Sequence, residues 1–187
     1  MSREIKSKVI GQLRQDETFS DWWTSQEIEI PFFDKEKFAI TFMDFEPEKD
    51  KTFMEEADRA LANFLGLGAQ DRLAISELVF KNCEECMEAL DDEDVNEDLR
   101  QIKDAKEIWN FVYPSEIYVA RRERRDKKIY IQIACDCDWE EEHGLQLVFR
   151  QGKKITRVSD QDGHLTEADA YDKPDSEDEL LSYGSIH

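Results

Sequence analysis

Four cysteines form two closely spaced pairs, Cys83 with Cys86 and Cys135 with Cys137. Four thiolates can hold a structural zinc ion, so this spacing first suggests a zinc site. However, the first pair belongs to the apolar stripe of an expected helix, and the second continues the apolar face of an expected strand. Zinc-binding Cys-x-x-Cys pairs are more typical of turns that contain glycine. We therefore interpret all four cysteines as reduced core thiols, and we predict no metal and no cofactor.

Two segments of the second half of the chain, 138–143 and 159–164, combine acidic residues with histidine. Crowded carboxylates raise the pKa of at least one member, as general acid catalysis requires. One alternative is therefore a metal-dependent hydrolase. The chain has no HExxH or GxSxG motif, no phosphate-binding loop and no dinucleotide fingerprint, so we predict a protein that is not an enzyme and has no catalytic residue. The hydrolase alternative would use Asp136, Asp138, His143 and Asp160.

The segment from Asp160 to Asp169 resembles part of a calcium-binding loop with Gly163 at its sixth position. The first ligand position falls on Val158, whose side chain cannot bind calcium. The residues before it also have the pattern of a strand, whereas a calcium loop follows a helix. We interpret the segment as an acidic turn in which Gly163 has a positive φ.

Acidic residues dominate the chain of 187 residues, with 45 Asp and Glu against 25 Lys and Arg and a formal net charge of −20. This charge repels nucleic-acid phosphates and anionic membranes, and it favours a basic protein partner. No apolar run is long enough to span a membrane, and the first residues lack the apolar segment of a signal peptide. We therefore expect a cytoplasmic protein.

The hydrophobic period changes several times along the chain, which separates the expected helices from the expected strands. Residues 1–20 have a helical pattern and predict an N-terminal helical extension. Strands near 28–32 and 38–42 predict a hairpin. A helical insertion then follows, with helices expected at 53–65, 70–90 and 105–112.

From Ser115 onward a period of two predicts four strands joined by short connections, and hence an antiparallel meander. The expected fold class is α+β: an antiparallel sheet of about six strands, made of hairpin, helical insertion and four-strand meander, with two or three helices packed on one face. Residues 21–171 form the single domain, and 172–187 are predicted to be a flexible acidic tail. The four strands cover 115–121, 128–137, 144–150 and 154–158.

The up-and-down order of these strands decides where the charged turns lie. The turn after 128–137 and the segment after 154–158 both emerge at one end of the sheet, so the two acidic segments should meet there. The basic turn 121–128 lies at the other end, and we interpret its charges as solvated. We predict that the acidic end binds a partner through Asp138, Trp139, Glu140, Glu141, Glu142, His143, Asp160, Asp162 and His164.

Trp139, inside the first acidic segment, has two interpretations that the sequence leaves open. An exposed tryptophan flanked by acids would be an anchor for a protein partner. A tryptophan folded back over the edge of the sheet would instead contribute to the core.

The segment from Cys135 to Phe149 (Cys-x-Cys-x-Trp-Glu-Glu-Glu-His-Gly-Leu-Gln and onward), followed by Asp162-Gly163-His164, resembles an uncharacterised family of small bacterial domains. The segment Ser25–Phe33 shares the resemblance, which covers about residues 20–170 and carries no catalytic residue. By analogy, small acidic proteins of this sort resemble immunity proteins, which neutralise a toxin. That analogy implies a basic toxin as the partner, recognised by electrostatic steering and occluded. A cytosolic regulatory or scaffold domain is a further alternative, and the oligomeric state stays open.

Overall fold

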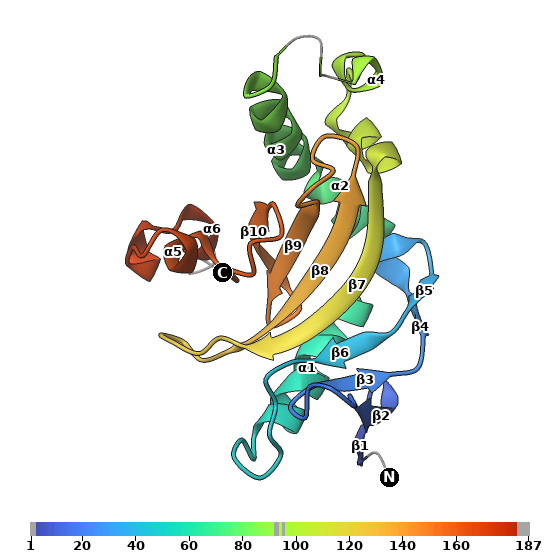
Figure 1. The fold of residues 1–187 in the computed structure, drawn as a ribbon, viewed down its shortest axis with the longest axis vertical. Helices are drawn as coiled ribbons and strands as arrows, with labels where there is room; N and C mark the ends of the chain where they lie inside the picture. The colour runs from blue at the N-terminus through green and yellow to red at the C-terminus, as the bar shows by residue number, and fades with distance from the viewer. Residues whose placement is uncertain (1–2, 92–93, 95, 183–187) are drawn as a thin grey trace.

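The computed structural model describes residues 3–91, 94 and 96–182, and its main element is an eight-stranded sheet seen face-on in Figure 1. The strands are β1 (Glu4–Ser7), β2 (Gly11–Gln15), β3 (Trp23–Ser25), β6 (Ile40–Phe42), β7 (Val112–Arg121), β8 (Ile129–Cys137), β9 (Leu145–Arg150) and β10 (Lys154–Ser159). Their spatial order is β1-β2-β3-β6-β7-β8-β9-β10. A separate two-stranded ladder contains β4 (Ile28–Ile30) and β5 (Glu36–Phe38).

The predicted four-strand meander is confirmed as β7 to β10, in which each strand pairs with the next in antiparallel orientation. Along β8, the residues Ile129, Ile131 and Ile133 are buried in the core, as their alternation predicted. Gln132, between them, points to the opposite face. The period of two therefore placed these side chains correctly because one face of these strands is covered by helices.

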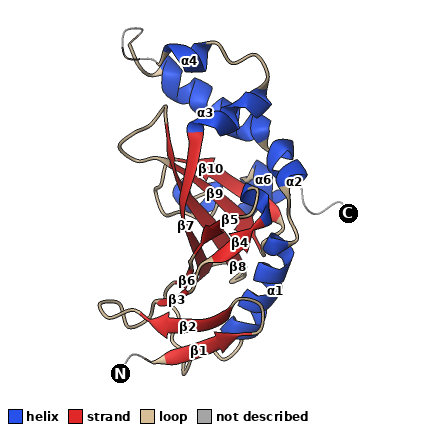
Figure 2. Cartoon of the chain, turned by 90° about the vertical axis from the view of Figure 1, so that its right-hand side faces the viewer, coloured by secondary structure: helices blue, strands red, loops and turns tan. Residues whose placement is uncertain are grey.

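The predicted N-terminal helix is wrong, because residues 4–15 form the β1–β2 hairpin and join the main sheet. Gly11, at φ +82°, closes the turn in a conformation that disfavours other residues. The Ser7 hydroxyl accepts the Ile10 backbone N–H at 3.0 Å and donates to Asp58. Figure 2 shows this hairpin lying against the first helix. Residues 4–15 are therefore part of the main sheet and do not form a helical extension.

The sheet also differs from the prediction in strand count and direction: it has eight strands, and β6 and β7 are parallel. The strand expected at 38–42 divides, because β5 pairs with β4 while β6 joins the main sheet between β3 and β7. The helical insertion accounts for the parallel pair. The chain leaves the sheet at the C-terminal end of β6, and the long crossover carries it back to the end where β6 began, so that β7 runs in the same direction.

Helices cover one face of the sheet and one of its ends. The helices are α1 (Phe53–Leu65), α2 (Ala69–Ala74), α3 (Ser76–Glu88), α4 (Glu97–Arg100), α5 (Glu167–Ala170) and α6 (Glu179–Ser182), with 3₁₀ turns η1 (Pro31–Phe33), η2 (Ala105–Phe111) and η3 (Asp175–Glu177). In Figure 1, α1 lies behind the sheet against β8, and α3 and α4 lie beyond its upper end. The helix expected over 70–90 divides at Ile75. In the described part of the chain, no helix is both long enough and apolar enough to cross a membrane.

Residues 165–182, which we call the C-terminal strap, fold back beside β10 through α5, η3 and α6 (Figure 1). The Asp178 side chain is buried in the strap and accepts the backbone N–H groups of Ala168 at 2.9 Å and Leu181 at 3.2 Å. The flexible tail predicted for 172–187 is therefore wrong for 172–182, because capping bonds and ion pairs order a segment with few apolar residues. Residues 183–187 lie outside the described residues.

Candidate functional site

The two acidic segments, 138–143 (the first bend) and 159–164 (the second bend), meet at one end of the sheet, as the strand order predicted. The backbone N–H of Gln161 donates to the carbonyl of His143 at 3.1 Å. The fully buried Gln146 side chain donates to Asp162 at 2.8 Å and to the His164 carbonyl at 3.1 Å. A buried amide is costly unless it is hydrogen-bonded, so these bonds hold the second bend against β9.

Glu140 fixes the shape of the first bend. Its carboxylate accepts the backbone N–H groups of Glu142 at 3.1 Å and of His143 at 3.2 Å, and the His143 ring lies 3.5 Å away. Partial burial opposes ionisation of Glu140, but these donors outweigh it and lower the pKa of the carboxyl. Glu140 is therefore committed to the turn, whereas Glu141 and Glu142 are exposed to solvent.

A hollow of about 840 Å³, which we call the acidic groove, lies between the first bend, the end of α3 and α4. Its apolar side includes Leu90, which is 45% exposed at the end of α3. Its acidic side includes the bend from Asp138 to Glu142. The remaining apolar lining comes from Cys86, Met87, Ala89 and Leu99.

Trp139 is folded back, which decides between its two interpretations. The side chain is only 6% exposed, and its indole Nε1 donates to the Asn82 side chain of α3 at 3.0 Å. The tryptophan therefore fixes the first bend to α3 and is one of the residues that line the acidic groove. Leu90 and Met87 provide the more accessible apolar surface, and sequence reasoning missed them as site residues. The available signal was an apolar helical stripe that ends immediately before an acidic stretch.

The second acidic bend contributes less to the groove than the sequence predicted. Asp162 accepts the His164 backbone N–H at 2.9 Å and pairs with the buried Arg157. Burial opposes its ionisation, but Arg157 and the backbone donor lower the pKa of Asp162. Gly163 has φ +79°, which confirms the acidic turn with a positive φ. Asp160, Asp162 and His164 do not line the acidic groove.

The geometry of the described residues does not assemble a metal centre, since no three side chains of His, Cys, Asp or Glu converge on a possible ion position there. Cys83, Cys135 and Cys137 are buried. Burial raises the pKa of Cys83 to about 12 and that of Cys137 to about 11, so both thiols keep their protons at neutral pH. His143, the histidine of the hydrolase hypothesis, lies beside Glu140 in the first bend, whereas His164 lies beside Asp162 in the second.

The basic turn lies at the other end of β8, as predicted, but its charges are not simply solvated. Arg121 pairs with Asp50 at 2.5 Å and with Glu56 at 2.6 Å. Arg122 and Arg125 pair with acids of the C-terminal strap, and Arg122 is 2% exposed. The strap neutralises this turn, because it returns acidic residues to the end of the sheet that β10 had left.

A model for a domain of unknown function, DUF6985, matches residues 9–165 of the chain. This match agrees with the expected resemblance to an uncharacterised family. No curated protein and no solved structure matches the chain.

Proposed function

Because the chain belongs to the DUF6985 family, whose function is unknown, we propose its function from its own geometry: a non-enzymatic binding domain whose acidic groove receives a basic segment of a partner protein. The observation that carries this proposal is that exposed Leu90 and the exposed carboxylates Glu141 and Glu142 line one groove.

The two sides of the groove would contribute differently to binding. Carboxylates attract a cationic segment over a distance and raise the rate of association, but their pairs with surface cations add little net affinity. Apolar surface such as Leu90 and Met87 gains free energy when a partner covers it. Lysine and arginine satisfy both sides, since their long stems are apolar and their ends are charged.

A basic toxin fits this description of a partner, and we propose neutralisation by occlusion of its cationic site as the most specific form of the function. A cytosolic regulatory or scaffold domain would use the same groove for a basic peptide. Four free cysteines suit a reducing compartment and support a cytoplasmic location.

We expect the double substitution Glu141→Lys and Glu142→Lys to slow association with a basic amphipathic peptide about tenfold at low salt, because it removes the local attraction. The probe is a synthetic helical peptide with lysine and arginine on one face and leucine on the other. Stopped-flow association rates at several salt concentrations should also show a flatter salt dependence. Glu140 is left intact, since it holds the turn.

The matched control is Glu17→Lys with Glu179→Lys, which changes the net charge equally at exposed acids outside the groove. This control should keep most of the native rate. Equal slowing in both double variants would mean that net charge alone attracts the peptide, and the groove would lose its assigned role.

A further inference from the structure

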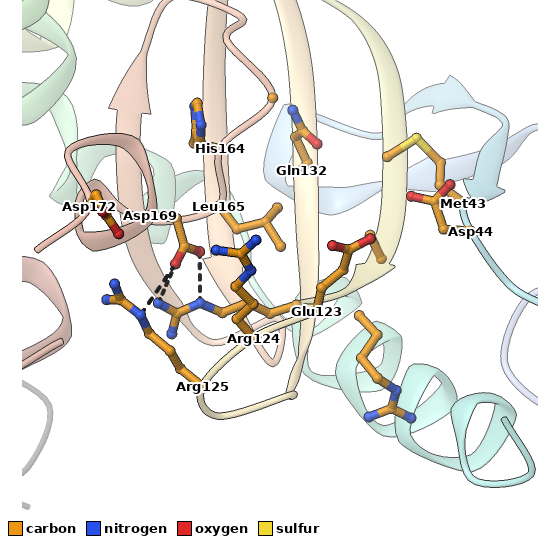
Figure 3. A pocket seen from close by; sticks show the side chains of 14 residues that line it. Met43, Asp44, Glu123, Arg124, Arg125, Gln132, His164, Leu165, Asp169 and Asp172 are labelled. Atoms are coloured by element: carbon orange, nitrogen blue, oxygen red, sulfur yellow. Dashed lines mark hydrogen bonds and ion pairs between the residues drawn. The ribbon is translucent and has the colours of Figure 1, made fainter. Parts of the chain in front are cut away.

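A second pocket, of about 460 Å³, lies on the sheet face turned away from α1 (Figure 3). It is bounded by the turn after β7, the C-terminal strap and the loop that follows β6. Among its lining residues, Met43, Ala120 and Leu165 are apolar, while most of the others are charged. It shares no lining residue with the acidic groove.

One wall of this pocket is already neutralised. Arg122 donates from Nε and Nη2 to the two carboxylate oxygens of Asp169, each at 2.8 Å, and further to Asp175 and Thr166. Asp169 also contacts Arg125 at 3.9 Å, and both residues are labelled in Figure 3. Since the donors of Arg122 are occupied, this network fixes the wall and leaves little capacity for a ligand.

Arg124, by contrast, is exposed and forms no hydrogen bond or ion pair with any residue that the structure describes. Its side chain lines the pocket, as does that of Leu165 (Figure 3). A planar guanidinium with free N–H donors matches the two oxygens of a carboxylate.

The side of the pocket near β6 has the opposite character. Asp44 and Glu123 lie there (Figure 3), and within the described part of the chain neither carboxylate pairs with a cation. Partial burial, together with the charges of Asp21 and Glu123, raises the pKa of Asp44. A positively charged ligand group would relieve this repulsion.

Gln132, on β8 between these two sides, provides a third polar group, a side-chain carbonyl oxygen that can accept a hydrogen bond. The side chain is only 9% exposed, and its Nε2 donates to Gln146. Its Oε1 has no hydrogen-bond donor among the described residues. A carbonyl oxygen that borders a pocket and has no protein donor is a possible acceptor for a ligand N–H.

We propose that this pocket binds a zwitterionic small molecule of the α-amino acid class. The carboxylate would pair with Arg124, the ammonium would lie toward Asp44 and Glu123, and Gln132 Oε1 would accept an N–H. A simple anion would meet the unpaired acids, and a simple cation would meet Arg124. The volume admits an amino acid or a dipeptide, with its side chain against Met43 and Leu165.

The test titrates the native protein with each proteinogenic L-amino acid by calorimetry, and then with the N-acetyl and C-terminal amide derivatives of the tightest binder. We expect at least one amino acid to bind, and each derivative to bind more weakly because it lacks one charge. Arg124→Ala should weaken binding about tenfold, since a charge-assisted contact is lost. Lys128→Ala is the matched control: it removes an exposed cation from the same turn but outside this pocket, and should bind normally.

Three results would overturn the proposal: no binding by any amino acid at millimolar concentration, undiminished binding of the N-acetyl derivative, or equal binding by Arg124→Ala. Acetate and inorganic phosphate, titrated alone, should bind far more weakly than the amino acid. If they bind as well, the pocket is a simple anion site and the zwitterion assignment is wrong. None of these results bears on the acidic groove, which uses other residues.

Discussion

Arg122→Met is expected to lower the free energy of unfolding by about 3 kcal/mol, because it removes the cation that two strap carboxylates share. Arg122 is almost fully buried and contacts Asp169 at 2.8 Å and Asp175 at 2.7 Å. Methionine fills much of the volume, so the loss reports mainly the uncompensated charges. Asp169 and Asp175 are partly exposed to solvent, so the loss of free energy of unfolding lies at the lower end of the range for a broken buried pair.

The loss should depend on pH in a defined direction. Arg122 is the largest influence on Asp175 and lowers the pKa of its carboxyl, while partial burial opposes this. A carboxyl whose pKa is lower in the folded state stabilises the protein above its unfolded pKa, and this stabilisation disappears as pH falls through the folded pKa. The difference in stability between native protein and Arg122→Met should therefore be full at neutral pH and shrink in acid.

Urea unfolding at neutral and acidic pH measures this difference, and Arg124→Ala is the control on the same turn. That control should change stability by no more than about 0.5 kcal/mol, since Arg124 is exposed and pairs with none of the residues that the structure describes. Hydrogen exchange should also show faster opening of the C-terminal strap in Arg122→Met. An unchanged urea midpoint and unchanged exchange in residues 165–182 would show that Arg122 does not hold the strap.

Gly152→Ala is expected to lower the free energy of unfolding by about 3–4 kcal/mol, through steric conflict added to backbone strain. Gly152, in the turn between β9 and β10, has φ +69°. A Cβ there would lie 2.0 Å from the carbonyl oxygen of Ala60 and 3.1 Å from the backbone nitrogen of Phe64. Both atoms belong to the backbone of α1, so the contact can be relieved only if the turn leaves the helix.

Gly163→Ala separates the two contributions. Gly163 has φ +79°, but a Cβ there would meet no atom within 4 Å. It should therefore cost only about 1–2 kcal/mol, the strain of a left-handed conformation. Thermal or urea unfolding of both variants gives the comparison. Equal losses in the two variants would mean that the steric conflict with α1 adds nothing to the cost of Gly152→Ala.

The meander could be predicted because Ile129, Ile131 and Ile133 alternate with residues of the opposite face over a long strand. The N-terminal hairpin could not, since Ile5, Ile10 and Leu13 are also compatible with a helix and the decisive contacts come from Asp58 on α1. The strap was missed for a related reason. Its order comes from ion pairs with Arg122, and such pairs leave no hydrophobic period in the sequence.

The candidate site was predictable only in its charged half. Strand order alone placed Glu140–Glu142 at the end of the sheet and next to the second bend. The apolar half depends on two helices, because Leu90 follows the end of α3 and Leu99 belongs to α4, and both line the same groove. A helical period cannot reveal that two helices line one groove.

Chemical-shift mapping with the basic amphipathic peptide tests the binding claim most directly. The labelled full-length protein is titrated, and the signals of the methyl groups and tryptophan indoles are followed. The proposed function predicts that the largest shifts come from Met87, Leu90 and Trp139, which line the acidic groove. Shifts that are centred on another face, or spread evenly over the exposed acids while Leu90 stays unmoved, would contradict it.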